Sequence, residues 1–386
     1  EKLMKPGGTR VFSMSPVTAS IVLRQYTLDL TSYLRKHRIS NWIGIGINPD
    51  GPEWGKIVTL LRTKGDNIFS IDFSNFGPGL NINVVYEFYN LMTSFYGKYL
   101  NLTEEDGNVM RCLIQELMYS VHLAGGTLYR TKSGSPSGAA ITVEINSFVH
   151  LMYINICWQI IGRVIRLHNK GSETVEEQLF LDNYKELVSY LEANGVDFDM
   201  YADMDSNQHE FVKNVVGVVY GDDGIFSVRD EFAEVFNAAT IQIVLRAHGI
   251  CATDASKGEK VKPYGPLSEM TFLKRSFRVH PLHRNEWLAP IDPDSIVECA
   301  RWIRKGPSAD LSTIENVHAS LLLCYGHGEK EYEKWRKRLN SYLFEEELEP
   351  VFLTWENIDM MFYPEYYHGQ QKTKEMEDFF KNIQKL

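Results

Sequence analysis

Cysteine is scarce in this sequence, and its spacing forms no recognised pattern. The five cysteines are scattered along the chain, and no two of them stand in a C-x-x-C arrangement. This scatter argues against a disulfide framework and a zinc cluster, and it favours a reducing compartment. A signal peptide, internal repeats and an uninterrupted apolar run of membrane-spanning length are also missing. The chain has no initiator Met, so we expect a processed product or a fragment.

An excess of positive charge is missing as well. The formal net charge is −10, which by itself disfavours binding to nucleic acid. The charges are distributed unevenly, however. Residues 1–64 lean basic, a second basic cluster follows Lys257, and acidic residues gather in 173–210. A phosphate-binding surface on one side of an acidic protein is compatible with this pattern, although most of these side chains taken singly are expected to be ordinary solvated charges.

Apolar residues are abundant enough for a large core. The chain has 386 residues, of which 44% are hydrophobic, and this length exceeds one ordinary domain. Gly and Pro residues around 278–293 indicate a boundary before an α-rich C-terminal domain. The apolar periodicity predicts helices at 17–38, 83–100, 139–168 and 231–249, a strand at 66–73, and mainly helices from 293 onward.

Two β-rich runs in 211–228 are joined by Tyr-Gly-Asp-Asp-Gly, a composition typical of a hairpin. Asp222 and Asp223 at its tip are adjacent carboxylates that repel each other, and a divalent cation is their natural counter-charge. Gly221 and Gly224 permit a tight turn and a close approach of the backbone to a ligand. A solvated Asp-rich turn is the alternative interpretation.

Asp72 also stands near the end of a β-rich run, in SIDFSNFGPGL. If its strand lies beside the 215–220 strand, Asp72 faces Asp222 across the sheet. Oxygen ligands from two strands can hold a pair of Mg²⁺ ions about 3.5–4 Å apart. Such a pair suits phosphoryl transfer, in which the protein mainly supplies positioning and charge.

The segment 133–147, SGSPSGAAITVEINS, combines a loop of small residues with a predicted helix start. Ser137 and Gly138 offer a hydroxyl and amides without bulk. Thr142 and Asn146 stand at positions i and i+4, so they share one helical face. This combination suits recognition of a sugar hydroxyl, but taken alone it is more often structural.

Basic residues occur in three further segments. Lys5 and Arg10 flank a Pro-Gly-Gly sequence, Lys257 follows a predicted helix, and Lys274 with Arg275 is expected on a strand. Each is a surface base by default. Beside a two-metal site, they fit binding to a triphosphate and to a nucleic-acid backbone.

The order of these segments resembles the RNA-dependent RNA polymerases of picorna-like positive-strand RNA viruses, closest to the iflavirus and dicistrovirus branch. The resemblance covers nearly the whole chain. The tetrapeptide YGDD alone is a weak signal, whereas motifs A, B, C and E in order are specific. The matching segments are KPGGTRVF (motif F), GINPDGPEWGKI (leading into the palm), DFSNF (motif A), SGSPSGAAITVEINS (motif B), YGDD (motif C), TDASKGEK (motif D), FLKR (motif E), and ARWIRK with LLLCYGHGEKEYEKW (opening of the thumb).

The resemblance implies an α+β right-hand fold of fingers, palm and thumb. An antiparallel palm sheet is flanked by helices, the thumb is α-rich, and the N-terminal fingers are expected to be largely missing from this chain. The implied parts are a remnant of the fingers at 1–28, palm at 29–110, a fingers insertion at 111–134, palm at 135–280 with an acidic insertion at about 170–210, and a thumb at 281–386.

The resemblance also implies a role for each candidate residue. Asp72 and Asp222, supported by Asp223, hold two Mg²⁺ or Mn²⁺ ions, and Lys257 is the general acid for pyrophosphate. The implied binding residues are Lys5, Arg10, Ser137, Gly138, Thr142 and Asn146 for the nucleoside triphosphate, and Lys274 and Arg275 for the primer strand. Implied partners are template RNA, a primer or protein-linked primer, and other viral replication proteins, on host cytoplasmic membranes and without a transmembrane segment of its own.

One departure concerns the sugar. Relatives carry a second Asp five residues after the first in motif A, and this position is Gly77 here. Reverse transcriptases place a bulky gate at the same offset, so Gly77 and the polar Asn146 favour ribonucleotides over that alternative. A non-catalytic RNA-binding or scaffolding protein on a polymerase-like palm is the other alternative, and the retained acids argue against it.

Overall fold

The computed structural model describes residues 12–202, 204, 208–253, 261–303 and 308–367. The chain divides into two compact units, each described here by itself. Unit 1 comprises Glu1–Gly46 and Leu60–Pro266, and unit 2 comprises Ile47–Thr59 and Leu267–Leu386. The palm and thumb limits inferred from sequence stay a prediction, because compact units are not the same as those functional divisions.

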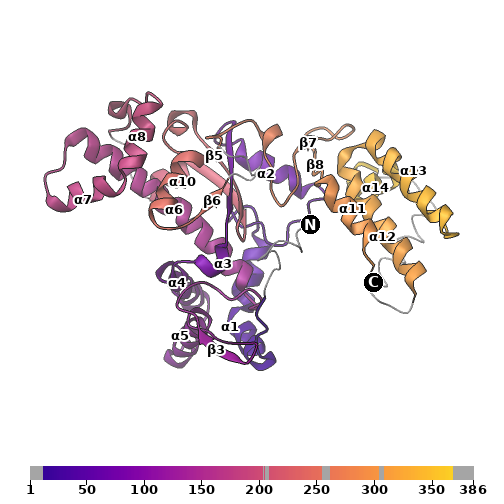
Figure 1. Cartoon of the computed structure of the whole chain (residues 1–386), viewed down its shortest axis with the longest axis horizontal. Coiled ribbons are helices and arrows are strands. Elements are labelled where there is room, and N and C mark those ends of the chain that lie inside the picture. The colour runs from indigo at the N-terminus through magenta and orange to yellow at the C-terminus, as the bar shows by residue number, and fades with distance from the viewer. Residues whose placement is uncertain (1–11, 203, 205–207, 254–260, 304–307, 368–386) are drawn as a thin grey trace. The chain divides into compact units, whose positions relative to one another are not determined.

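A four-stranded antiparallel sheet lies in unit 1, with the strand order β4-β5-β1-β6 (Figure 1). β-branched and aromatic residues dominate these strands, and all but the last position of β4 are buried. The predicted strand at 66–73 and the predicted hairpin are therefore confirmed. The bounds are β1 (Asn67–Phe73), β4 (Val215–Tyr220), β5 (Asp223–Val228) and β6 (Ala252–Thr253).

Helices α6 and α10 of unit 1 pack against this sheet. The predicted helices at 17–38, 83–100 and 139–168 correspond to α1, α4 and α6. The helix predicted at 231–249 is the shorter α10, which begins at Ala238 because the Asn237 side chain caps it there. Their bounds, with the shorter elements, are α1 (Val17–Lys36), α3 (Phe76–Gly79), α4 (Ile82–Tyr99), α5 (Glu104–Met118), β2 (Val121–Ala124), β3 (Thr127–Arg130), α6 (Thr142–Lys170), α7 (Val175–Asn183), α8 (Lys185–Ala193), η2 (Phe198–Tyr201), α9 (Gln208–Asn214), η3 (Asp230–Phe232) and α10 (Ala238–Ala247).

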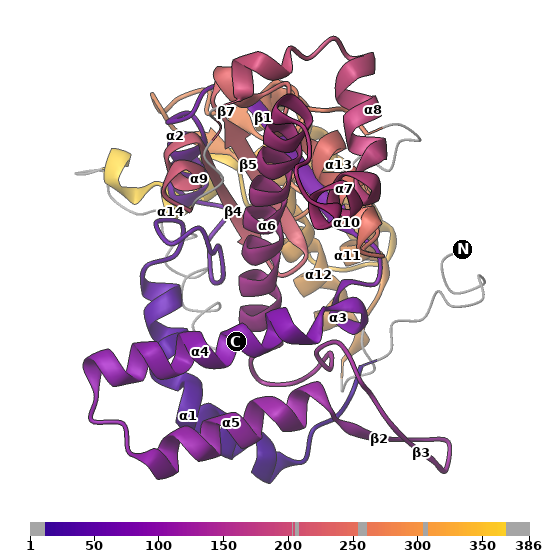
Figure 2. The same ribbon diagram turned by 90° about the vertical axis from the view of Figure 1, so that its left-hand side faces the viewer.

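Helix α6 is the longest of the described helices and runs past β4 and β5 (Figure 2). Its apolar residues recur at helical spacing, and Ile145, Val149 and Trp158 are fully buried. By length and composition alone α6 could cross a membrane. However, 56% of its most apolar window is buried inside the protein, which is the behaviour of a core helix.

The acidic segment at about 170–210 contains helices that pack on unit 1. Leu187 and Leu191 of α8 and Tyr201 are buried in its core. The guanidinium of Arg163 on α6 lies over the ring of Phe180 on α7, 4.2 Å from its centroid. The described part of the segment thus contains helices α7 and α8 and the short η2, and it contributes to the core of unit 1.

The described residues of unit 2 contain five α-helices, a short hairpin and a second core. Trp54 stacks on Phe277 with ring centroids 4.8 Å apart, which joins the 47–59 segment to the rest of the unit. The helical pattern predicted from 293 onward is confirmed for the described residues. The elements are α2 (Glu53–Leu61, whose last two residues fall in unit 1), η4 (Leu267–Glu269), β7 (Arg278–Val279), β8 (Trp287–Leu288), α11 (Pro293–Arg301), α12 (Ala309–Cys324), η5 (Tyr325–His327), α13 (Glu329–Glu345), α14 (Trp355–Phe362) and η6 (Pro364–Tyr367).

Candidate active site

Asp222 lies in a two-residue hairpin loop. Tyr220 pairs with Asp223 as the last residues of β4 and β5, so only Gly221 and Asp222 remain between the strands. Of these two, only Gly221 has a positive φ, at 65°. A positive φ at the first loop position alone is the pattern of a type II′ turn, which requires glycine there and matches the twist of the strands.

Asp72 stands at the end of β1, but its neighbour in the sheet differs from the sequence-based expectation. β1 pairs with β5, not with the 215–220 strand. Both strands of the hairpin are buried apolar runs, so the sequence does not distinguish the inner strand from the outer one. The last pair is Ile71 with Gly224, and the next positions along the two strands are Asp72 and Asp223.

This register places three carboxylates at one end of adjacent strands. Asp72, Asp222 and Asp223 are each half-buried. The backbone N–H of Phe73 donates to Oδ1 of Asp72 over 3.0 Å. Hard carboxylate oxygens are the ligands that Mg²⁺ and Mn²⁺ prefer, so the donor set fits a divalent cation.

The turn is held from behind by helix α6. The Gly221 N–H donates to Oγ of Ser147 over 2.8 Å, and Nδ1 of His150 lies 3.2 Å from the Gly221 carbonyl oxygen. Both α6 side chains are fully buried. Neither residue was singled out from the sequence, where a Ser and a His in an apolar helix read as ordinary core positions.

The loop before α6 is bonded to the turn that follows Asp72. The Gly-Pro-Gly sequence after Asp72 lies in the short helix α3, which is entered through Asn75 in the left-handed conformation. The Ser135 N–H donates to the Gly77 carbonyl over 2.9 Å, and the Gly134 N–H donates to the Leu80 carbonyl over 3.1 Å. A Cβ on Gly134 would lie 2.7 Å from the Gly77 carbonyl oxygen, so only glycine fits at residue 134.

Ser137 and Gly138 lie on the exposed part of the same loop. The Ser13 N–H donates to the Ser137 carbonyl over 2.7 Å. Gly138 has φ 111°, and a Cβ there would lie 2.2 Å from the Ser13 carbonyl oxygen. Gly138 is therefore required by the close passage of the chain at Ser13, while its predicted contact with a triphosphate stays a prediction.

Thr142 and Asn146 share a face of α6, as predicted from their spacing. The Thr142 hydroxyl is within hydrogen-bonding distance of the Pro136 and Ala139 carbonyls, both at 2.9 Å, and so braces the loop. Oδ1 of Asn146 is buried and has no hydrogen-bond partner among the described residues. A buried acceptor without a donor is costly, and a bound hydroxyl group would satisfy it.

Lys274 and Arg275 belong to unit 2, and their expected strand is absent from the described residues there. Leu273 and Lys274 both have positive φ, at 53° and 58°. They form a two-residue turn between Phe272 and Arg275, whose backbones exchange two hydrogen bonds of 2.9 Å. Positive φ at two non-glycine residues is uncommon, and the sequence carries no turn signal there.

The two basic side chains differ in surroundings. Lys274 is exposed, whereas Arg275 is 8% exposed. The Arg275 guanidinium donates to the Asp50 carboxylate over 2.9 Å and to the Ala289 carbonyl over 2.8 Å. Burial raises the pKa of Asp50, although the neighbouring guanidinium acts to lower it. Arg275 thus joins three segments of unit 2.

Comparison with known proteins identifies the family. The sequence matches the viral RNA-dependent RNA polymerase family over residues 1–343. The chain belongs to this family. It is 30% identical to the genome polyprotein of deformed wing virus over 94% of this chain and 11% of that polyprotein. It is 28% identical to the replicase polyprotein of acute bee paralysis virus over 86% of this chain and 16% of that one. The chain therefore spans a small part of these relatives.

A solved structure supports the fold. The Sicinivirus 3Dpol RNA-dependent RNA polymerase superposes with a TM-score of 0.66 at 18% identity, covering 90% of this chain and 61% of that one. The α+β right-hand polymerase fold inferred from the order of motifs is confirmed. The roles of individual residues in this chain stay predictions.

Three predicted residues of the polymerase chain lie outside the described residues. They are Lys5 and Arg10 of motif F and Lys257 of motif D. Their roles rest on the resemblance alone.

Unit 2 contains a cluster of buried polar side chains that was not predicted from the sequence, although the His-x-x-His spacing is a signal for it. His280 and His283 lie 2.9 and 2.7 Å from the oxygens of Asp359, and all three are buried. Two backbone N–H groups, of Leu282 and His283, donate to Nδ1 of His280. Nδ1 therefore lacks a hydrogen and Nε2 carries it, so this nitrogen donates to Asp359 and cannot bind a metal.

The Asp359 carboxylate also accepts from the hydroxyls of Tyr325 and Tyr367. Burial acts to raise the pKa of Asp359, but the hydrogen bonds from the two histidines and two tyrosines outweigh it and hold the pKa at about 2. The cluster is a satisfied hydrogen-bond network, not a metal centre.

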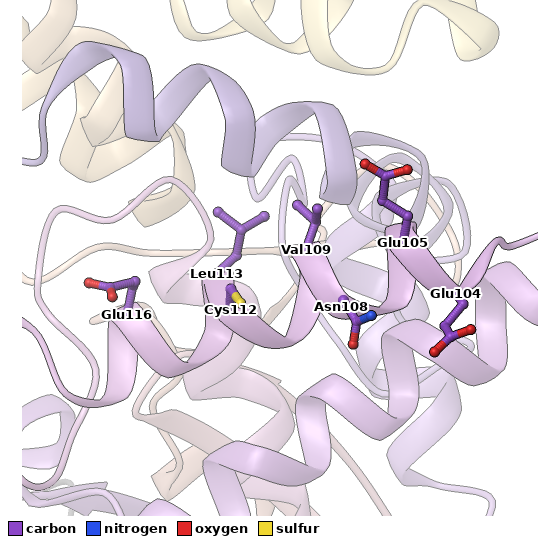
Figure 3. A pocket seen from close by; sticks show the side chains of 7 residues that line it. All are labelled: Glu104, Glu105, Asn108, Val109, Cys112, Leu113 and Glu116. Atoms are coloured by element: carbon purple, nitrogen blue, oxygen red, sulfur yellow. The ribbon is translucent and has the colours of Figure 1, made fainter.

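A depression of about 530 Å³ lies along α5 (Figure 3). All seven side chains that line it come from this one helix, and three of them, Glu104, Glu105 and Glu116, are acidic. Carboxylates repel a triphosphate, and none of the candidate site residues lines this depression. It is not the nucleotide site.

Proposed function

We propose that this chain carries the active site of an RNA-directed RNA polymerase that replicates a positive-strand viral RNA genome. The observation that carries the proposal is the convergence of Asp72, Asp222 and Asp223 at one end of the sheet, within a member of this polymerase family. In the reaction the primer 3′-hydroxyl oxygen forms a bond to the α-phosphorus of a nucleoside triphosphate. The bond from that phosphorus to the bridging oxygen breaks, and pyrophosphate leaves.

Asp72 and Asp222, with Asp223 in support, would hold two Mg²⁺ or Mn²⁺ ions. When bound, such ions activate the attacking hydroxyl and stabilise charge on the leaving pyrophosphate. The protein contributes the fixed position of its three carboxylates. Lys257 is our candidate for the acid that gives a proton to pyrophosphate.

Sugar recognition is assigned to the start of α6. Oδ1 of Asn146 is a buried hydrogen-bond acceptor without a partner among the described residues. A ribose hydroxyl is a hydrogen-bond donor and would satisfy it. Ser137 is exposed on the adjoining loop. Thr142 acts on the loop through its bonds to two carbonyls. Gly77 supplies no side chain, so we propose that Asn146 carries more of this contact than in relatives with an acid there.

Phosphate contacts are assigned to basic residues. Lys5 and Arg10 are proposed to bind the triphosphate, and the exposed Lys274 is proposed to bind the primer strand. We assign Arg275 instead to the internal structure of unit 2, because its guanidinium is occupied by Asp50 and Ala289.

We further propose the setting of this activity. The relatives are polyproteins, which supports a protein released beside other viral replication proteins. Template RNA, nucleoside triphosphates and a protein-linked primer are the expected partners. The proposed location is the host cytoplasm, in membrane-associated replication complexes.

Primer extension on an RNA template tests the function. The chain is supplied with Mg²⁺ and ribonucleotides. A version extended by any residues that precede it in its reading frame is assayed in parallel. Asp222→Asn should lower the rate about a thousandfold, since losing a metal ligand removes several kcal/mol of charge stabilisation. Asp66→Asn is the matched control, because Asp66 is an exposed acid of the same unit whose side chain is 80% exposed.

The same assay separates the alternatives. Full activity in Asp222→Asn would contradict the assignment of Asp222 to the metal site. Preference for deoxyribonucleotides would indicate a reverse transcriptase. RNA binding without synthesis by the extended version, together with no Mg²⁺ or Mn²⁺ binding in a titration, would indicate a non-catalytic scaffold.

A further inference from the structure

Gly221, the residue before the candidate metal-binding acids, is held by one helix at both its backbone N–H and its carbonyl oxygen. Ser147 and His150 stand three residues apart on α6, so they share a face. The Ser147 hydroxyl donates to the Val143 carbonyl over 2.7 Å, which leaves its oxygen to accept from the Gly221 N–H. Nδ1 of His150 is hydrogen-bonded to the Gly221 carbonyl oxygen. The residue that sets the left-handed turn is thereby fixed in orientation, directly before Asp222.

The chemistry of the His150 bond fixes the state of the ring. A carbonyl oxygen only accepts, so Nδ1 carries the hydrogen and donates it. Nε2 is then a bare acceptor, and it is buried without a partner among the described residues. Burial lowers the pKa of His150 to about 3, so the ring is neutral at the pH of RNA synthesis.

This arrangement is not the one that stability alone would favour. A buried unpartnered nitrogen costs about 1–3 kcal/mol, which a phenylalanine ring of similar shape would avoid. Buried polar groups left unsatisfied in this way call for an explanation beyond packing. The donor at Nδ1, which phenylalanine lacks, is the feature that distinguishes histidine here.

The ring also contacts both strands that carry the acids. Its centroid lies 4.8 Å from that of Phe73 and 5.9 Å from that of Phe76, the residues on either side of the Asp72 turn. On the other strand it lies 5.6 Å from Phe226. Gly224 leaves the space that the ring fills. One side chain therefore touches the segments of Asp72 and of Asp222.

We propose that His150, together with Ser147, is a positioning residue that holds the Gly221–Asp222–Asp223 turn in the geometry required for divalent-cation binding. The proposal rests on the proposed polymerase function. His150 touches neither substrate nor metal in it, and acts through the backbone of the turn. Partners that orient metal ligands typically account for about tenfold to a hundredfold in metal affinity or activity.

Two substitutions at residue 150 separate positioning from packing. His150→Phe keeps a ring and removes the donor. His150→Asn is smaller but places an amide N–H close to the position of Nδ1–H. The measurements are kcat, the KM for nucleoside triphosphate, the Mg²⁺ concentration for half-maximal rate, and the melting temperature.

We expect His150→Phe to raise the half-maximal Mg²⁺ concentration about tenfold and to lower kcat about tenfold to a hundredfold. The KM for nucleoside triphosphate and the melting temperature should change little, because the lost bond to Gly221 is offset by removal of the unpartnered nitrogen. His150→Asn should recover most of the Mg²⁺ response despite its poorer packing.

Ser147→Ala provides an independent test, since it removes the acceptor for the Gly221 N–H, together with the hydroxyl's own bond to the Val143 carbonyl within α6. Its matched control is Ser320→Ala in unit 2, where a buried hydroxyl on helix α12 donates to the Ile296 carbonyl over 3.4 Å. We expect Ser147→Ala to shift the Mg²⁺ response in the same direction as His150→Phe, and Ser320→Ala to leave it unchanged.

Several outcomes would overturn the proposal. A wild-type Mg²⁺ response in folded His150→Phe would do so, as would equal losses in His150→Phe and His150→Asn. If His150→Phe does not fold, a wild-type Mg²⁺ response in Ser147→Ala overturns it. Failure of the polymerase function itself is distinguishable, because the wild type would then show no primer extension, or a rate that Asp222→Asn does not change.

Discussion

His150 fills the space beside Gly224 so completely that a Cβ added to Gly224 would lie 2.5 Å from Cε1 of the imidazole. The same Cβ would lie 2.8 Å from the Phe226 ring. Gly224 was expected from the sequence to allow approach of a ligand, but in the structure it allows approach of this histidine. Gly224 of strand β5 and His150 of helix α6 are therefore a matched pair.

Gly224→Ala should destabilise the protein and impair synthesis. Overpacking a buried site costs about 1–3 kcal/mol, and here the strain falls beside the turn that we propose binds the metal ions. Gly97→Ala is the control of opposite sign, because Gly97 is an exposed residue of α4 with no atom within 4 Å of its added Cβ. It should gain about 0.5–1 kcal/mol and keep full activity. Chemical denaturation and primer extension measure both, and a fully active Gly224→Ala would contradict the matched pair.

Asn146→Ala should relax discrimination between ribonucleotides and deoxyribonucleotides by about tenfold, the value of one hydrogen bond to a buried acceptor. The free energy of unfolding should change little, because Oδ1 of Asn146 has no partner among the described residues. Asn155→Ala, on the same helix, should leave the ratio of incorporation rates unchanged. An unaltered ratio in Asn146→Ala would remove Asn146 from sugar recognition.

Lys274 and Arg275 should respond differently to substitution although they are adjacent. Arg275→Ala should lower the free energy of unfolding by about 2 kcal/mol, because it leaves Asp50 and the Ala289 carbonyl without their donor. Lys274→Ala should leave stability unchanged and weaken primer binding, with a shallower dependence of affinity on salt. Thermal denaturation and a salt titration of RNA binding distinguish the two. A steeper loss of RNA affinity in a stable Arg275→Ala would reverse this assignment.

His150 should make the protein less stable in mild acid. Its pKa in the folded state, about 3, lies below the unfolded value near 6.5, so the unfolded chain binds the extra proton as pH falls. Above pH 6.5 this difference in pKa hardly affects stability. Below pH 6.5 the free energy of unfolding falls as the pH approaches 3, and the loss between pH 7 and 5 is about 2 kcal/mol. His150→Phe should therefore lose about 2 kcal/mol less than the wild type over this interval, and parallel curves would show that His150 is not the titrating group.

Much of the fold was predictable because its elements carry strong local signals. β-rich runs on both sides of Tyr-Gly-Asp-Asp-Gly indicate the hairpin, and the apolar period of 139–168 indicates α6. The strand order was not predictable in the same way. Both hairpin strands are buried on two faces, and local sequence does not indicate which one β1 joins.

The meeting of acidic side chains at one end of the sheet was predictable, as at Asp72 and Asp222, while their roles stay predictions. The local structure was not predictable where a common residue adopts an uncommon backbone conformation or pairs with a distant residue. Leu273 and Lys274 adopt left-handed conformations without glycine or asparagine, and the neighbouring residues decide this. Likewise, the pairing of Arg275 with Asp50 joins positions 225 residues apart in the chain.

The bonds between the loop before α6 and the turn after Asp72 have a consequence for sequence divergence. Ser135 and Gly77 meet through an amide and a carbonyl, groups that every residue except proline supplies in full. Replacement of either side chain leaves this connection in place. An acid at residue 77 can therefore be lost or regained by a single substitution, while the hydrogen bond between the two segments remains.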